Sequence, residues 1–265
     1  MTEDQFDEFI LPHLSNGKRG PKTALSFYKL FNYILSFLYT GCQWKELFIE
    51  KDASGKPEIH YTRVFRVFQH WERLIKYLSI QYTASTRIIC WIPVWNNNGR
   101  KKRGDSIGYS GHKRLKGDKV VAFCDRHGNV VAPFVTAPGN QNECPLFPQA
   151  FQPLRRIAKA VGFQLSGSVM SLDSIYDSRA NRKMIFNHGM TLNIPENQRN
   201  RKSTKRGRKR LFEPRLFLER FFTIERVFGW EDKFKRLLIR FEHLSHQHYA
   251  LKTIAYTMIN LRHFC

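Results

Sequence analysis

The stretch KVVAFCDRHGNVVAPFVTA, at residues 119–137, decides the fold class of this chain. Two runs rich in β-branched and aromatic residues flank the tripeptide RHG, a pattern that predicts two strands around a tight turn. An earlier run of the same kind, RIICWIPVW at residues 87–95, predicts another strand. Together the three runs predict a meander of three strands.

Helical and extended patterns alternate after this meander. Two helices and two short strands are predicted in turn, at residues 143–161, 168–172, 178–188 and 190–194. A longer helix is predicted at residues 217–241. This order of elements is that of a ribonuclease-H-like α/β domain. The predicted fold class is therefore α/β, with a mixed sheet flanked by helices.

The long helix, FLERFFTIERVFGWEDKFKRLLIRF, has a carboxylate within its apolar face. The apolar residues of this face recur at steps of four, three and four: Phe217, Phe221, Ile224 and Phe228. Glu225 lies one turn from both Phe221 and Phe228. A carboxylate there is costly unless it is paired, hydrogen-bonded or bound to a cation. A glutamate paired with a nearby basic residue and a metal ligand are both open interpretations.

Residues 1–82 are predicted to form a separate all-helical domain, and residues 83–265 the α/β domain. Thr2 is a candidate N-cap for the first helix, and Gly41 is placed to end the second. A third helix, within residues 59–78, is amphipathic, and its basic residues lie largely off the apolar side. Three helices with basic outer faces fit a helix-turn-helix-like DNA-binding module, and they equally fit a small bundle with a solvated face.

The charge of the chain favours a polyanionic partner. It has 265 residues, with 44 Lys and Arg against 22 Asp and Glu, and a formal charge of +22. Nucleic acid is the first candidate partner and a membrane surface the second. The acidic start MTEDQFDEF does not resemble a secretory signal, and the most apolar segment is short for a membrane span. Five scattered cysteines without a CxxC pair favour reduced thiols in a cytoplasm.

Two segments are strongly basic. GRKKRGDSIGYSGHKRLKGDK, at residues 99–119, is polar and predicts a surface loop or hairpin, and NQRNRKSTKRGRKR, at residues 197–210, has eight basic residues and no acid. Such runs neutralise phosphates in DNA-binding proteins, although solvated loops that keep a chain soluble look the same. The candidate DNA contacts in these segments are Arg100, Lys101, Lys102, Lys113, Arg114, Arg201, Lys202, Arg206 and Arg208.

Several motifs match a known family in order along nearly the whole chain. TGCQWKEL and YTRVFRVFQHW lie in the N-terminal part, and GYSGHKRLKGDKVVAFCDRHGNVVAPFVTAPGNQNE, SLDSIYDSRANRK, NIPENQR and RFFTIERVFGWEDKFKRLLIRFE follow. They resemble the N-terminal module and the catalytic domain of bacterial insertion-sequence transposases of the DDE type. The resemblance implies a homodimer on double-stranded DNA that binds terminal inverted repeats, and cleaves them and joins them to target DNA. It implies a cytoplasmic protein that associates with the nucleoid.

The resemblance also implies site residues. Asp173 matches the second catalytic aspartate of the family, and Glu225 matches the third carboxylate. Arg220 and Lys233 stand near the basic positions around that glutamate, each offset by about one residue. Two Mg²⁺ ions, which Mn²⁺ can replace, are expected to be held by Asp173 and Glu225, because displacement at phosphorus uses two divalent ions and Mg²⁺ prefers carboxylate oxygens.

Capping is the competing interpretation for two aspartates in this region. Taken alone, Asp173 is better explained as a residue that caps the turn after its strand. Asp177 is expected to be an N-cap of the next helix rather than a metal ligand.

The chain departs from the family at the first catalytic aspartate. No acidic residue lies between Glu72 and Asp105, and WIPVWNNNGRKKRG, at residues 91–104, takes the expected place. Asparagine can coordinate Mg²⁺ but carries no charge. Asp105 is the nearest acid, although it matches a non-catalytic loop position of the family. Leu218 stands where the family has a tyrosine.

Three hypotheses follow from this departure. The first is an active DDE transposase, and the second is a non-catalytic DNA-binding relic or repressor of transposon ends, which the missing aspartate favours. A stand-alone nuclease of the same fold is a weaker third. We also hypothesise that NNNGRKK, at residues 96–102, is an out-of-frame reading of TTTAAKK, although restoring that frame alone would not return an aspartate.

Overall fold

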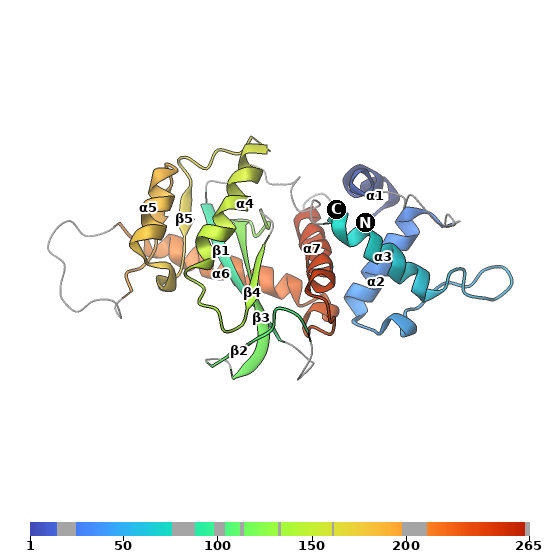
Figure 1. Ribbon diagram of the computed structural model, residues 1–265. Coiled ribbons are helices and arrows are strands. Elements are labelled where there is room, and N and C mark those ends of the chain that lie inside the picture. Colours follow the sequence, from blue (N-terminus) through green and yellow to red (C-terminus); the bar gives the residue numbers. More distant parts are fainter. Residues whose placement is uncertain are drawn as a thin grey trace. The chain divides into compact units, whose positions relative to one another are not determined.

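The computed structural model describes the chain in two compact units (Figure 1). Described are residues 1–14, 25–75, 88–97, 104–111, 114–131, 134–160, 162–197 and 211–262, with backbone alone at 73–75 and 88–97. The first unit comprises Met1–Ser79, Asn96–Asp105 and Trp230–Cys265. The second comprises Ile80–Trp95 and Ser106–Gly229.

The second unit is built on a six-stranded mixed sheet. Its strands are β1 (Ile88–Asn97), β2 (Gly108–Ser110), β3 (Leu115–Asp125), β4 (Val135–Pro138), β5 (Val169–Ser171) and β6 (Thr191–Asn193). They are ordered β2-β3-β1-β5-β6, and β4 also pairs with β3. β3 is antiparallel to β2 and β4, whereas β5 is parallel to both β1 and β6. This arrangement confirms the predicted ribonuclease-H-like fold.

The hairpin predicted at residues 119–137 is present. Its turn begins at Asp125, whose Oδ1 accepts hydrogen bonds from the backbone N–H groups of His127 and Asn129, both at 2.9 Å. Gly128 has a φ of 83°, a conformation that favours glycine. The basic segment before it also forms a hairpin, because Gly108 of β2 pairs with Gly117 of β3.

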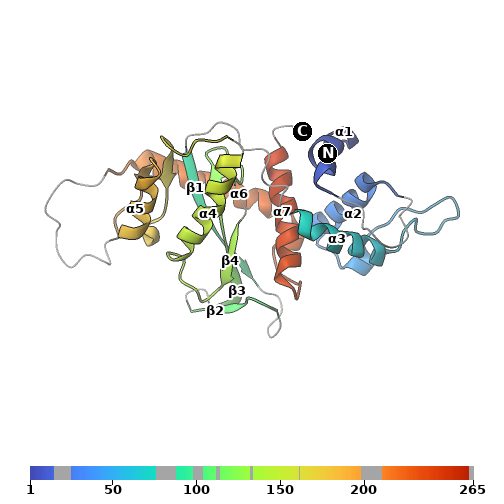
Figure 2. The same cartoon turned by 45° about the horizontal axis from the view of Figure 1, so that its top comes forward.

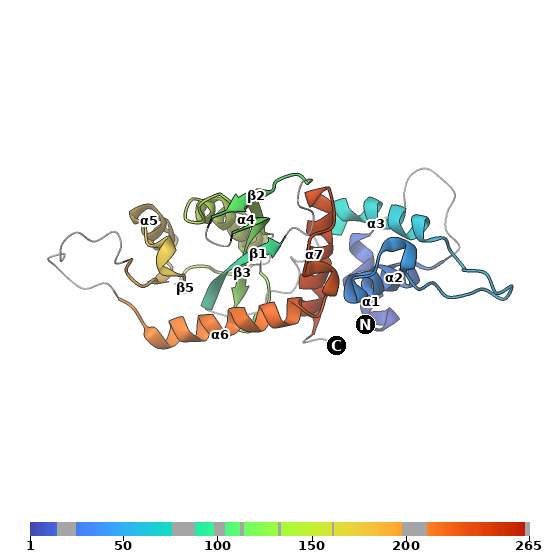
Figure 3. The ribbon, with the colours of Figure 1, turned by 90° about the horizontal axis from the view of Figure 1, so that it is seen from below.

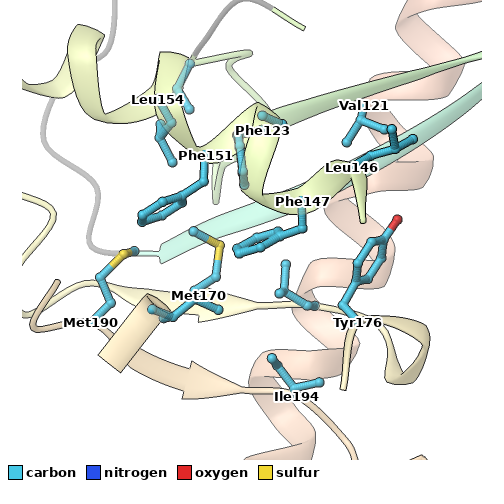
Figure 4. Packing of buried hydrophobic residues seen from close by; sticks show 14 of the residues in the cluster. Val121, Phe123, Leu146, Phe147, Phe151, Leu154, Met170, Tyr176, Met190 and Ile194 are labelled. Atoms are coloured by element: carbon cyan, nitrogen blue, oxygen red, sulfur yellow. The ribbon is translucent and has the colours of Figure 1, made fainter. Parts of the chain in front are cut away.

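Helices cover both faces of this sheet. They are α4 (Leu146–Ala160), α5 (Arg179–Asn187) and α6 (Pro214–Glu231). α4 and α6 lie on opposite faces (Figures 1 and 3). On the α4 face, Phe147 and Phe151 pack on side chains of β3 and β5, among them Phe123 and Met170 (Figure 4). These four residues have no measurable exposure, so the core of the unit lies here.

The N-cap of α5 is not the predicted residue. Ser178 holds this position, and its hydroxyl accepts a hydrogen bond from the backbone N–H of Asn181. Asp177 instead forms a salt bridge with Arg182 at 2.6 Å and accepts a hydrogen bond from the backbone N–H of Asn197 at 2.9 Å. The N-cap prediction for Asp177 was therefore wrong by one residue. The Asp177 carboxylate pairs with the inward-facing Arg182 and does not cap the helix.

The helix predicted at residues 217–241 ends early. α6 stops at Glu231 and is followed by the 3-10 turn η6 (Lys235–Leu237). Tertiary contacts explain the stop: Phe234 packs on the ring of Tyr39 at 4.6 Å, and Arg236 donates to the carbonyl of Cys42 at 3.2 Å. A straight continuation of α6 would forgo these contacts.

The first unit is helical. It contains α1 (Glu3–Phe9), η1 (Leu11–His13), α2 (Phe27–Thr40), η2 (Trp44–Glu46), α3 (Tyr61–Ile75), η6 and α7 (Ser245–Leu261), and Figure 2 shows α1, α2 and α3 lying together. Thr2 forms the predicted cap with Gln5, and Gly41 ends α2 with a φ of 69°. Within the described residues, no helix is both long enough and apolar enough to span a membrane.

The division of the chain differs from the predicted one. We expected residues 83–265 to form a single domain, but Trp230–Cys265 belongs to the first unit. α7 packs against α3 there, and Nε2 of His246 lies 3.2 Å from Glu72. A contact between elements so distant in sequence leaves no periodic signal in either of them.

Candidate functional site

Asp173 lies immediately beyond the carboxyl end of β5. The strand pairing continues to Leu172, whose N–H donates to the carbonyl of Asn193 at 3.2 Å. The Asp173 side chain is exposed and caps the 3-10 turn η4 (Ser174–Tyr176), and the hydroxyl of Ser174 donates to its Oδ1 at 3.1 Å. The predicted capping role is confirmed. It leaves Oδ2 without a hydrogen bond from any described residue, so the carboxylate still presents an oxygen to a ligand.

Buried contacts fix the backbone that carries Asp173. Tyr176 is fully buried, and its hydroxyl donates to Oε2 of Glu143 at 2.9 Å. Oε1 of Glu143 lies 3.2 Å from Nζ of Lys119 on β3. These two contacts connect the loop after β5 to the start of α4 and to β3. Sequence reasoning placed Tyr176 beside the candidate site but missed Glu143, because only the tertiary structure brings their side chains together.

Glu225 lies on the exposed side of α6. It shares that side with Leu218, Phe221 and Phe222, which are 54%, 49% and 58% exposed. Among the described residues, the Glu225 side chain has neither an ion pair nor a hydrogen bond. The predicted alternative of a glutamate paired with a nearby basic residue therefore has no support there, and the side chain is available to a ligand.

The buried side of α6 is not the predicted one. It consists of Arg220, Thr223, Ile224, Val227 and Glu231. Of the predicted apolar face only Ile224 is buried, because Phe221 is half-exposed and Phe217 and Phe228 are partly exposed. The aromatic periodicity of α6 therefore marks a surface that faces solvent in this structure.

Polar contacts hold α6 to the sheet at two places. At its start, the N–H of Glu213 donates to Oδ1 of Asn193 at 2.8 Å, and Nδ2 of Asn193 donates to the Glu213 carbonyl at 3.1 Å. In its middle, the Thr223 hydroxyl donates to the carbonyl of Arg126 at 3.3 Å. Arg126 also forms a salt bridge with Glu219 at 2.9 Å. Together these contacts anchor α6 at the end of β6 and at the β3–β4 turn.

The predicted basic contacts lie in different environments. Arg220 is 6% exposed, and its guanidinium lies 4.6 Å from the centre of the Phe217 ring without an ion-pair partner in the described part of the chain. Lys233 and Arg114 are exposed. The remaining candidates lie outside the described residues: Arg100, Lys101, Lys102, Lys113, Arg201, Lys202, Arg206 and Arg208.

Asp105, the acid nearest to the missing first aspartate, has a structural role. Its Oδ1 lies 2.6 Å from the guanidinium of Arg240 and accepts a hydrogen bond from the N–H of Ser245 at 2.6 Å. Oδ2 accepts from the hydroxyl of Ser245 at 2.7 Å. Burial alone raises the pKa of Asp105, but the bonds from Ser245 and Arg240 outweigh it and lower the pKa below its usual value. Both carboxylate oxygens are thus engaged within the first unit.

The described carboxylates do not complete a two-metal site. No group of three or more His, Cys, Asp or Glu side chains is placed to hold a metal ion in the described residues. Asp173 and Glu225 have available oxygens, but a hard divalent cation prefers several carboxylate ligands from rigid elements. The segment at residues 91–104 contains no acid, and Asp105 is engaged elsewhere. These residues therefore do not fit a pair of divalent ions.

Comparison with known proteins places the chain in a family. The family described as "Transposase DDE domain" matches residues 92–261, well over half of the chain. The chain belongs to the DDE transposases. Its structure resembles that of a piggyBac transposase in a synaptic complex with hairpin DNA, with a TM-score of 0.52 and 10% identity over 99% of this chain and 74% of the other.

Further comparisons of this DDE transposase are weaker. A Mos1 transposase in a paired-end complex with left transposon end aligns with a TM-score of 0.29 and 13% identity, over 71% of this chain and 48% of the other. No curated protein matches the sequence. Family membership supports transposition in general and the use of divalent metal ions by the class. Asp173 and Glu225, the two carboxylates that the resemblance predicts, both lie within the matched residues 92–261.

Proposed function

We propose that this DDE transposase binds the terminal inverted repeats of an insertion sequence as a homodimer and acts on them by DNA cleavage and strand transfer. The observation that carries the proposal is the position of Asp173, exposed directly after β5 within the segment that matches the family. Glu225, available on α6, would be the second acidic group of the site. The class uses divalent metal ions, but the described carboxylates of this chain do not by themselves fit a pair of them, so the assay below supplies Mg²⁺ or Mn²⁺.

The charge of the chain supports DNA as the partner. The formal charge of +22 is carried partly by two runs, at residues 99–119 and 197–210. Basic side chains that contact phosphates release counterions, so binding weakens with salt in proportion to the number of contacts. We expect the affinity for duplex DNA to fall by about a thousandfold or more between 50 and 200 mM salt, if six or more phosphates are contacted.

A second candidate function is supported by the acidic residues. A non-catalytic protein that occupies transposon ends, as a relic or a repressor, would need the DNA-binding surface but not the full set of carboxylates. The chain lacks an acid between Glu72 and Asp105, and both oxygens of Asp105 are engaged by Arg240 and Ser245. The two functions share DNA binding and differ only in cutting.

Cleavage of the element's own terminal repeat separates the two candidates. The assay compares the native chain, Asp173→Asn, Glu225→Gln and a repaired chain with Val94→Asp, Trp95→Gly and Asn96→Thr, each with Mg²⁺ and with Mn²⁺. Loss of an essential carboxylate costs several orders of magnitude in rate. If the native chain cuts and Asp173→Asn abolishes cutting, the transposase function stands. If only the repaired chain cuts, the native chain is a non-catalytic end-binding protein.

Two further outcomes would contradict the proposed site. Cutting by the native chain that survives both Asp173→Asn and Glu225→Gln would remove these residues from the site. Absence of repeat binding at low salt by all four proteins would remove the proposed function itself. A thermal melt of each variant serves as the folding control. Asparagine caps a helical turn about as well as aspartate, and Glu225 is exposed, so we expect changes of less than about 0.5 kcal/mol in the free energy of unfolding.

A further inference from the structure

α3 has a buried side that fixes its position in the first unit. Val64, Phe68 and Trp71 of this helix are buried. The Trp71 ring packs on Phe27 of α2 at 5.2 Å, and the Phe68 ring lies 5.7 Å from Trp44 of η2. These ring contacts come from two other elements, and α7 also packs against α3. α3 is therefore held by packing rather than by its own helix propensity.

The opposite side of α3 is exposed and made of hydrogen-bonding side chains. Arg63, Arg66, Gln69 and His70 recur at steps of three, three and one, which places them on one side of a helix with 3.6 residues per turn. No acidic residue lies among them. In the described part of the chain, the side chains of Arg63 and Arg66 have no hydrogen-bond or ion-pair partner. An exposed helix face of a soluble protein more often mixes both signs of charge.

A network of charged and polar groups supports the segment before α3. Glu58 accepts a hydrogen bond from the hydroxyl of Tyr33 on α2, and Nζ of Lys29 lies 2.6 Å from Glu58 and 2.8 Å from Glu50. Burial and the bond to Glu58 raise the pKa of Tyr33 to about 12, so the hydroxyl keeps its proton at neutral pH. The start of α3 is thus tied to α2, and a helix held this way presents its exposed side as a rigid surface.

The exposed residues match the chemistry of base recognition. Arginine donates two parallel hydrogen bonds to guanine, and glutamine pairs in the same way with adenine. Arg63 and Gln69 are separated by about 9 Å along the axis at 1.5 Å per residue, the length of about three base pairs. The major groove of B-DNA is wide enough for one α-helix. A membrane surface fits less well, because the apolar side that would enter it is buried in the unit.

We propose that the exposed side of α3, defined by Arg63, Arg66, Gln69 and His70, reads base edges in the major groove of duplex DNA. This inference rests on the proposed DNA-binding function and names the surface that would give it sequence specificity. Arg66, at the centre of the surface, would recognise a guanine. Gln69 would recognise an adenine in a neighbouring base pair.

The test is selection of binding sites from a library of randomised 25-base-pair duplexes with the full chain. Arg66→Lys keeps the charge but loses the bidentate geometry, and Gln69→Ala removes one recognition group. Each should lower the preference for one base pair roughly 5- to 100-fold, at two adjacent positions of the selected site.

The matched control is Arg156→Lys, the same substitution at an exposed arginine of α4 in the second unit. It should leave the selected site unaltered. A selected site that is identical for native, Arg66→Lys and Gln69→Ala proteins would overturn the inference while leaving DNA binding intact. Salt-dependent binding without any selected sequence would overturn it in the same way. Absence of binding to any duplex at low salt would overturn both the inference and the proposed function.

Discussion

At the scale of single residues, the carboxylates of this transposase differ in what they are able to do. Asp173 and Glu225 are exposed and present oxygens that no described residue occupies. Asp105 is nearest in sequence to the missing aspartate, but Arg240 and Ser245 use both of its oxygens. Proximity along the chain is therefore a poor guide to a substitute ligand.

The role of Asp105 leads to a stability prediction. Asp105→Ala leaves the guanidinium of Arg240, which is 1% exposed, without its carboxylate. Because a charge-assisted hydrogen bond to a buried arginine is lost, the free energy of unfolding should fall by about 1–3 kcal/mol. Urea unfolding followed by circular dichroism measures this change, with the exposed Asp7→Ala as control. Equal stability of the two variants would show that Arg240 does not need Asp105.

Glu242 makes the first unit sensitive to acid. Burial alone raises the pKa of this carboxyl, but the hydrogen bond from His248 and the charge of Arg236 outweigh burial and lower the pKa to about 2. Oε1 of Glu242 lies 2.7 Å from Arg236, and Oε2 lies 3.4 Å from His248. A depressed pKa in the folded state means that the ionised form stabilises the fold.

The resulting stabilisation is complete above the unfolded pKa of 4.5 and is lost as the pH falls towards 2. We expect it to be about 3 kcal/mol at neutral pH. In Glu242→Gln, the free energy of unfolding should be lower at pH 7 and should change less than in the native chain between pH 4.5 and 2. Urea titrations at several pH values measure the difference. Parallel pH profiles for the two proteins would rule out this role.

At the scale of elements, α6 shows why periodicity does not identify the buried side of a helix. Its aromatic residues recur at helical spacing, yet the side that packs on the sheet contains Arg220, Thr223, Ile224 and Val227. Phe221 and Phe222 lie on the other side, next to Glu225. The hydrophobic content of a face is local information, whereas burial depends on which surface meets the sheet.

This assignment predicts unequal effects of truncation along α6. Val227→Ala removes buried methyl groups and should lower the free energy of unfolding by about 1–3 kcal/mol. Phe222→Ala removes a larger side chain that is 58% exposed. It should change the free energy of unfolding by less than about 0.5 kcal/mol. Urea unfolding of both variants measures the contrast. A larger loss for Phe222→Ala would mean that the aromatic side is the packed one.

At the scale of the whole molecule, the C-terminal segment belongs to the helical unit of the N-terminus. α7 packs on α3, and its Lys252 pairs with Glu231 at the end of α6, both being buried. The hydroxyl of Tyr256 donates to Glu231 at 3.0 Å. The first unit is therefore assembled from both ends of the chain, so the unit with the proposed DNA-reading surface depends on residues more than 150 positions away.

The dependence can be measured by hydrogen exchange. Leu251→Ala creates a cavity at a fully buried position of α7 and should cost about 2–5 kcal/mol. Because α7 supports α3, amides of α3 should exchange faster, whereas those of α5 in the second unit should be unaffected. Mass spectrometry of peptides from the two helices gives the comparison. Faster exchange in α5 with α3 unchanged would contradict this organisation of the chain.

The sequence by itself determined β1, β3, β4, β5 and β6, the turn between β3 and β4, and the position of Asp173 after β5. Alternating β-branched runs and Gly128 define the β3–β4 hairpin, and the buried-type run before Asp173 defines β5. These features follow from backbone preferences within a few residues of each other. The family resemblance identified Glu225 as a candidate site residue, because the matching residues around it are contiguous in the sequence.

Only the tertiary structure decided which surfaces are buried and where the chain divides. The end of α6 at Glu231, the exposed side that carries Glu225 and the membership of α7 in the first unit all depend on distant contacts. The engagement of Asp105 by Arg240 joins residues 135 positions apart. Burial and charge pairing are energies between surfaces that meet in space, so no local pattern of residues specifies them.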